Sequence, residues 1–238
     1  MTTEDQPLPP VDAAPSPRPA AWTALATLLT LLASFVISGL GSSALPGTAD
    51  RYISSQVARN IPLLTADATL QLAFGTALIV LAVTLGGYLV PGGIIGRLAL
   101  IGGILGGAAF IAAGAVLQET VFYSVFLGGG QASRLAAASG SKDLTALNLA
   151  IGVVAGGLRS SGSYLFGLAW VGWGVLGMRT NRLPRLLGIV GLIAGLGFAL
   201  TNWIGPFAGP FGFFGSLIWL GGLALVLFRR NVPAARTT

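Results

Sequence analysis

Apolar runs that approach the thickness of a lipid bilayer constrain this chain more than any other feature. A transmembrane helix needs about 20 consecutive apolar residues, and the sequence offers six such windows, separated by polar or glycine-containing turns. We place them at about 21–40, 68–90, 98–117, 160–178, 186–204 and 211–228. The expected fold class is therefore all-α, a polytopic transmembrane bundle with six spans.

Composition supports this class and excludes several others. Apolar residues make up 54% of the chain and charged residues 8%, whereas soluble domains carry about 25% charged residues. The chain has no cysteine and no histidine, so thiol nucleophiles, disulfides, the usual zinc sites and histidine acid–base catalysis are excluded. The net charge of +6 comes from arginines at the ends of the apolar runs, so we expect no nucleic-acid partner. Arginine far outnumbers lysine, and alanine, glycine and leucine are abundant, a composition that indicates a GC-rich bacterial genome.

A short basic turn sets the predicted orientation. The turn carries Arg179, Arg182 and Arg185 between two apolar runs, and short loops rich in arginine stay on the cytoplasmic side of a membrane. With six spans, both termini then lie in the cytoplasm, while the uncharged turn Gly205–Pro210 faces outward. Residues 1–20 read as a disordered, proline-rich tail and 229–238 as a basic tail. Residues 41–67 and 118–159 become outer loops.

Two segments leave alternatives open. The first apolar run resembles a signal peptide because Ser42-Ser43-Ala44 follows it, but the run exceeds the 7–15 residues typical of that class. We expect it to be a retained span. Leu144–Leu158 is apolar but short, and a seventh span there would move the basic turn outside. It remains a surface helix, a re-entrant helix, or the start of one long helix.

The hairpin also carries a family resemblance. The run Leu168-Ala-Trp-Val-Gly-Trp-Gly-Val-Leu-Gly-Met178 precedes Arg-Thr-Asn-Arg-Leu-Pro-Arg-Leu-Leu-Gly188 and Ile-Val-Gly-Leu-Ile-Ala-Gly195. This pattern of a glycine-rich span, a basic turn ending in Leu-Pro-Arg and a following helix resembles the DUF4386 family of bacterial membrane proteins. The match covers about a quarter of the chain. It implies a bundle of about six helices and carries no activity.

Candidate site residues lie at span ends. No ionisable residue falls at the centre of a predicted span, although such residues are the usual mark of proton-coupled or ion-coupled transport. The polar residues gather instead at the predicted outer side: Asp67, Gln71, Gln118, Glu119, Asn148, Arg159 and Asn202. We expect Glu119 and Arg159 to form an ion pair there, beside a polar cavity for a headgroup or small ligand; solvated span ends are the simpler interpretation. Trp219 is expected as an interfacial anchor, and Trp170 and Trp173 as packing residues.

These observations rank three classes of function. An accessory or structural bundle in the bacterial plasma membrane, acting through lipid or protein contacts, is favoured because small-residue faces abound and central polar residues are lacking. A transporter or binding protein for small solutes or lipids is the alternative. A membrane enzyme ranks last, because no Gly-x-Ser-x-Gly elbow is present. No catalytic residue, metal site or cofactor is predicted; the expected partners are membrane lipids and a membrane protein or a second copy.

Overall fold

The computed structural model describes residues 16–43, 55–89, 93–122, 141–204 and 207–230. This part of the chain consists of helices and short turns and contains no strand. Its helices are α1 (Arg18–Ser43), α2 (Ser55–Leu89), α3 (Ile94–Phe122), α5 (Ser141–Arg179), α6 (Arg185–Ile204) and α7 (Ala208–Arg229). The prediction of an all-helical bundle is confirmed.

Four helices contain a stretch that is long and apolar enough to cross a membrane unaided. These stretches are Arg18–Ile37 in α1, Thr65–Leu89 in α2, Ile94–Gln118 in α3 and Ala208–Arg229 in α7. The apolar stretch of α6, Arg185–Thr201, is shorter. The described chain therefore has the helices of a membrane protein.

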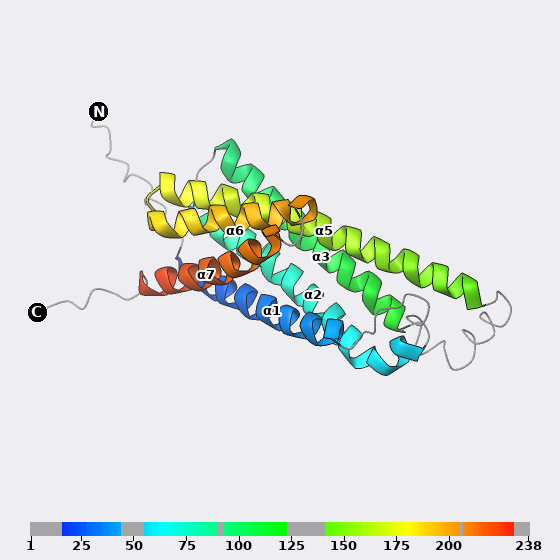
Figure 1. Cartoon of the computed structure of the whole chain (residues 1–238). Coiled ribbons are helices and arrows are strands. Elements are labelled where there is room, and N and C mark those ends of the chain that lie inside the picture. Colours follow the sequence, from blue (N-terminus) through cyan, green and yellow to red (C-terminus); the bar gives the residue numbers. More distant parts are fainter. Residues whose placement is uncertain (1–15, 44–54, 90–92, 123–140, 205–206, 231–238) are drawn as a thin grey trace, which may run out of the picture.

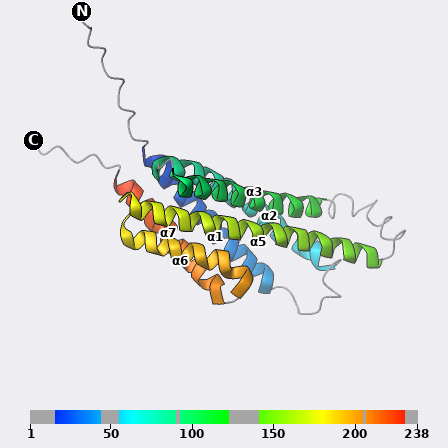
Figure 2. The ribbon, with the colours of Figure 1, turned by 90° about the horizontal axis from the view of Figure 1, so that it is seen from above.

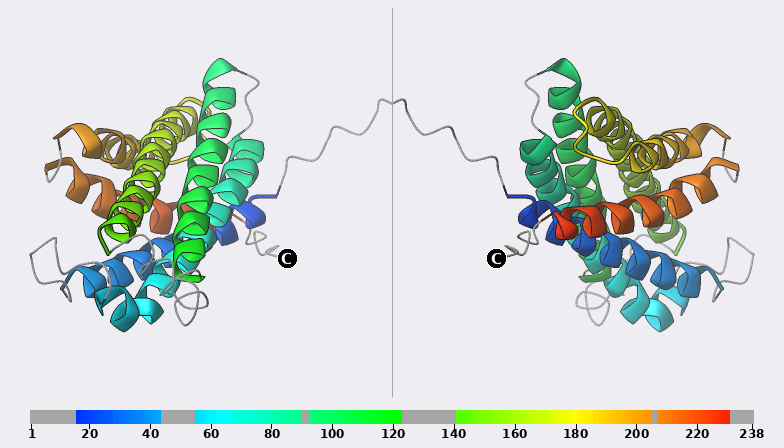
Figure 3. Two further views of the ribbon diagram at one scale, coloured as in Figure 1. Left: turned by 90° about the vertical axis from the view of Figure 1, so that its right-hand side faces the viewer. Right: turned by 90° about the vertical axis from the view of Figure 1, so that its left-hand side faces the viewer.

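The helices follow one another around a closed ring. Each packs on the next along the chain, and α7 closes the ring by packing against α1 (Figure 3). The start of α1, the end of α7 and the α5–α6 turn lie at one end of the bundle (Figure 1), which we call the terminal end. The starts of α2 and α5 lie at the opposite end, here called the distal end. Neighbouring helices thus run antiparallel.

α5 resolves one alternative left open by the sequence. Leu144–Leu158 belongs to a single continuous helix of 39 residues, which measures roughly 58 Å at about 1.5 Å per residue. It is neither a separate span nor a helix broken at Gly156-Gly157. Because α6 has 20 residues and α7 has 22, α5 projects beyond both toward the distal end (Figure 2).

Several helices extend past the apolar runs from which the spans were predicted. α1 begins at Arg18, inside the predicted tail 1–20, and Ala20 is buried. Pro19 is tolerated there because the first turn of a helix needs no internal N–H donors. α2 begins at Ser55, so the whole second half of the predicted loop 41–67 is helical, with Pro62 inside it. α3 extends to Phe122 and α5 begins at Ser141, so both ends of the predicted loop 118–159 are helical.

Close helix contacts in the bundle rest on small residues. A Cβ atom on Gly75 of α2 would lie 2.5 Å from the carbonyl oxygen of Gly107 on α3, and one on Gly107 would lie 2.6 Å from that of Gly75. On the other side of α3, a Cβ on Gly106 would lie 2.9 Å from the backbone nitrogen of Phe166. Glycines on both sides let α3 approach α2 and α5 at backbone distance. The glycines of the third predicted span therefore pack inside the bundle.

Candidate functional site

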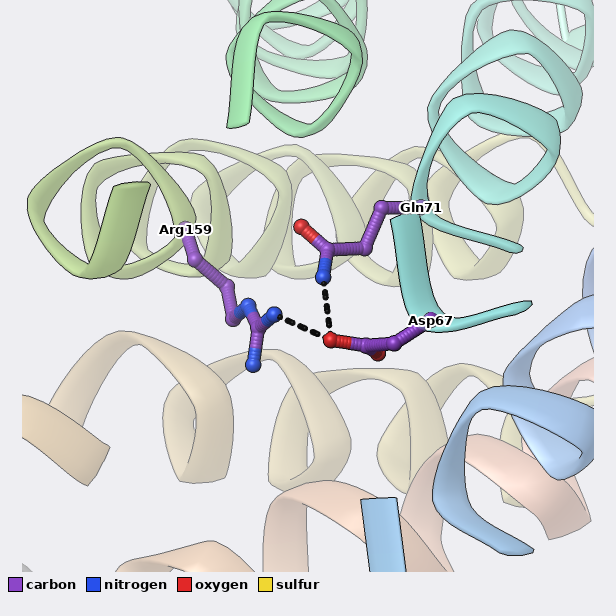
Figure 4. A network of polar contacts seen from close by, with 3 residues as sticks. All are labelled: Asp67, Gln71 and Arg159. Atoms are coloured by element: carbon purple, nitrogen blue, oxygen red, sulfur yellow. Dashed lines mark hydrogen bonds and ion pairs between the residues drawn. The ribbon is translucent and has the colours of Figure 1, made fainter. Parts of the chain in front are cut away.

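The one ion pair found between described side chains links α2 to α5. Arg159 Nη2 donates to Asp67 Oδ2 at 2.9 Å, and Gln71 Nε2 donates to the same oxygen at 2.9 Å (Figure 4). Asp67 and Gln71 are one helical turn apart and share a face of α2. We call these three residues the Asp67 cluster.

The position of this cluster follows from the unequal helix lengths. α2 and α5 are not neighbours in the ring, yet they meet across it. Along the antiparallel α5–α6 pair, Gly174 faces Gly188 and Gly167 faces Gly195, and the same register places Arg159 level with Trp203 in the last turn of α6. Arg159 therefore lies where α6 stops covering α5. Its side chain is 41% exposed, whereas that of Asp67 is 20% exposed.

The Asp67 cluster holds hydrogen-bonding capacity that its own contacts do not use. Gln71 is 3% exposed, and its Oε1 accepts no hydrogen bond from the described residues. The buried Arg159 Nε also has no hydrogen-bond partner among them. The acceptor Gln71 Oε1 and the cationic donor Arg159 Nε thus lie beside the Asp67 carboxylate. A ligand that carries both a hydrogen-bond donor and an anionic or polar acceptor would match these groups.

The structure brings together three of the seven predicted site residues, Asp67, Gln71 and Arg159. Gln118 is exposed near the distal end of α3. Glu119, Asn148 and Asn202 lie in helices, but their side chains fall outside the described part of the structure.

Arg159 pairs with Asp67, and the expected pair of Arg159 with Glu119 stays a prediction because the Glu119 side chain lies outside the described part of the structure. Glycine contacts such as Gly106 beside Gly162 set the α3–α5 register. That register places the backbone of Glu119 level with about residue 150, roughly 13 Å along α5 from Arg159. The sequence predicted Asp67 and Glu119 on the same side of the membrane. The helix register shows that their backbones lie at different levels along α5.

An aromatic column fills the ring between the Asp67 cluster and the terminal end. Phe74 meets Phe110 at 5.0 Å and Phe166 at 6.1 Å between ring centroids, one helical turn below Gln71. Phe166 contacts Trp170 at 5.1 Å, and Trp170 contacts Trp219 at 4.8 Å. All five rings are at most 7% exposed. The polar cluster is therefore separated from the terminal end by packed aromatic side chains.

Trp219 corrects an expectation. Its side chain is 0% exposed and stacks on Trp173, with the ring centroids 6.3 Å apart and an angle of 4° between the ring planes. Trp219 is therefore a core residue and not an interfacial anchor. Trp170 and Trp173 are core residues, as predicted. The indole nitrogens of all three lack a hydrogen-bond partner in the described chain, so these side chains contribute bulk and ring contacts only.

A second polar arrangement, at the terminal end, was missed by the sequence analysis. Arg182 Nη1 donates to the backbone oxygen of Tyr88, and Arg182 Cζ lies 5.4 Å from the centroid of the Tyr88 ring. Arg230 Nη1 donates to Tyr88 Oη at 3.0 Å. Nothing near Tyr88 along the chain signals two arginines that are 94 and 142 residues away.

Neither polar cluster has the composition of a metal centre. Among the residues that the structure describes, no three His, Cys, Asp or Glu side chains gather closely enough to hold a metal ion. Comparisons with family models, curated proteins and solved structures found no match for this chain.

Proposed function

We propose that the chain is a six-span protein of the bacterial plasma membrane, with both termini in the cytoplasm, that works as an accessory bundle through contacts with lipids and a partner membrane protein. The positive-inside rule supports this orientation, because arginines concentrate at the terminal end. The resemblance of the hairpin to the DUF4386 family belongs to the same proposal.

The observation that carries an accessory role is the aromatic column inside a closed ring of helices. A solute route along the ring axis would need polar groups near the middle of the membrane, whereas large buried aromatic side chains, among them Phe74, Phe166 and Trp170, pack inside the ring. Large apolar side chains cover the outside, as on Leu105 of α3, which is 50% exposed, and Ile218 of α7, which is 64% exposed. The outer faces are thus available for contacts, while the interior is occupied.

Orientation is tested by cysteine labelling, for which the absence of native cysteines is convenient. Pro184→Cys in the α5–α6 turn and Phe207→Cys before α7 place single thiols at exposed positions of opposite ends. In intact cells, a membrane-impermeant maleimide should label Phe207→Cys only, and both after lysis. Labelling of Pro184→Cys in intact cells would reject the proposed orientation.

The accessory role is tested by photocrosslinking in the native membrane. A photoreactive residue at Ile218 or Leu105 should yield one adduct of reproducible mass with a membrane protein, and the matched control at Leu220, which is 0% exposed, should yield none. Only lipid adducts at both exposed positions, together with solute uptake by reconstituted vesicles, would contradict the accessory role.

The Asp67 cluster favours a second candidate function, the binding of a polar or zwitterionic headgroup from the outer leaflet. Its support is the unused acceptor on Gln71 and the unused donor on Arg159. Phosphatidylethanolamine added to the detergent-solubilised protein should raise the unfolding temperature of the native chain, and Gln71→Leu should remove that increase. Equal responses of the native chain and Gln71→Leu would eliminate this candidate.

A further inference from the structure

Charge is distributed unequally between the two ends of the bundle. Seven arginines lie at the terminal end, and the described residues of that end include no aspartate or glutamate; the seven are Arg18, Arg97, Arg179, Arg182, Arg185, Arg229 and Arg230. The other charged residues in the described helices are three cationic and three acidic ones, so their charges cancel; they are Arg59, Lys142, Arg159, Asp67, Glu119 and Asp143. The described part of the terminal end is therefore strongly cationic, with no carboxylate among its described residues to neutralise it.

Two of these arginines are held in place by Tyr88. The Tyr88 carbonyl belongs to the last turn of α2, where helix carbonyls lack internal partners and a cation is stabilised by the helix dipole. Arg182 from the α5–α6 turn donates to this carbonyl and lies over the ring, while Arg230, just past α7, donates to the hydroxyl. Tyr88 is 7% exposed, so it forms a fixed support. We call these three residues the Tyr88 clamp.

Most N–H donors of Arg182 and Arg230 in the Tyr88 clamp do not bond to Tyr88. A guanidinium group has five N–H donors, and each arginine directs one hydrogen bond to Tyr88. Two guanidinium groups that are each held by Tyr88 in advance lose less side-chain entropy when an anion binds. They also suit the bidentate geometry of a phosphate.

Apolar surface lies beside the clamp. Trp22 on α1 meets Phe228 on α7 at 5.1 Å between ring centroids, and it is 62% exposed. Along the same two helices, Leu29 is 57% exposed and Leu225 is 53% exposed. A phosphate group alone would leave this strip uncovered, whereas acyl chains attached to the phosphate would cover it.

We propose that the Tyr88 clamp binds the phosphate of an anionic phospholipid, whose acyl chains lie along the exposed strip of α1 and α7. The inference rests on the proposed insertion of the bundle in a membrane. It goes further by assigning one headgroup class to one set of residues. Anionic lipid would link the ends of α2, α5 and α7, where the described arginines bring positive charges together.

The test uses the full chain, delipidated in a non-ionic detergent and titrated with phosphatidylglycerol or phosphatidylcholine of matched acyl chains. Unfolding temperature and native mass spectrometry report stabilisation and bound lipid. We expect phosphatidylglycerol to bind at least fivefold more tightly than phosphatidylcholine. The combined change Arg182→Gln and Arg230→Gln should abolish this preference.

Arg97→Gln with Arg185→Gln is the matched control, because it removes the same charge from exposed residues of the same end and should keep most of the preference. Tyr88→Phe, which removes only the acceptor of Arg230, should weaken it partly. Equal loss in the control and clamp variants would overturn the assigned site, and would reduce the effect to general charge. Stabilisation by inorganic phosphate equal to that by phosphatidylglycerol would overturn the lipid assignment.

Two different experiments test the lipid site at the Tyr88 clamp and the proposed orientation in the membrane, so one can fail without the other. Cysteine labelling reports orientation without regard to lipid preference. Cytoplasmic labelling of Pro184→Cys with no phosphatidylglycerol preference would reject the clamp alone. External labelling with the preference intact would reject the orientation alone.

Discussion

Replacing Gly75 by alanine tests the close approach of α2 and α3 most directly. The added Cβ would lie 2.5 Å from the Gly107 carbonyl oxygen and 2.9 Å from the backbone nitrogen of Ile111. Carbon and oxygen atoms in contact are normally about 3.3 Å apart or more, so the helices would have to separate by roughly 0.8 Å. Backbone atoms cannot rotate away as a side chain can.

The expected cost combines two opposing terms. Overpacking costs about 1–3 kcal/mol, and backbone contacts favour the upper end of that range. Alanine recovers about 1 kcal/mol through its higher helix propensity. We therefore expect Gly75→Ala to lower the free energy of unfolding by about 2 kcal/mol, which for a chain of this size lowers the unfolding temperature by roughly 4–8 °C.

Gly87 of the same helix supplies the control. A Cβ there would meet nothing within 4 Å, so Gly87→Ala should gain stability by up to about 1 kcal/mol. Thermal scans of tryptophan fluorescence in detergent would compare the two variants, because the buried tryptophans report loss of packing. If Gly75→Ala proves as stable as Gly87→Ala, the helix approach described for α2 and α3 is wrong.

Three further outcomes are expected. Asn181 has φ of 52° in the α5–α6 turn, so Asn181→Ala should lower stability by about 1 kcal/mol and Asn181→Gly should not, as thermal scans would show. Exchanging the charges by Arg159→Asp with Asp67→Arg should restore about 1 kcal/mol of the free energy of unfolding relative to the single variants in a double-mutant cycle. The value is modest because the Arg159 side chain is 41% exposed. A coupling energy of zero would refute the pair. Trp219→Ala should cost about 3–5 kcal/mol by denaturant unfolding, whereas Trp203→Ala, at a residue 81% exposed, should change stability by less than about 0.5 kcal/mol.

The local pattern of apolar, polar and charged residues along the sequence was enough to predict the fold class of this protein. Apolar runs and scarce charge predicted a helical membrane bundle, because a helix in lipid must satisfy its backbone internally and present apolar side chains. The basic turn at Arg179–Arg185 predicted a hairpin, and α5 and α6 flank it. The polar residues Asp67, Gln71 and Arg159 were recognisable as candidates because polar side chains are rare near spans. These inferences need only the character of a residue and its immediate neighbours.

Tertiary structure decided which distant residues meet. Glycine contacts fix the register between helices, so they brought Asp67 against Arg159 and placed Tyr88 between Arg182 and Arg230. Contacts with Trp170 and Trp173 of α5 and with Gly191 of α6 buried Trp219, which was expected to be an interfacial anchor. Such outcomes depend on axial shifts of a few residues between helices. An apolar sequence rich in glycine permits many such shifts, and only the packing of the whole ring selects one.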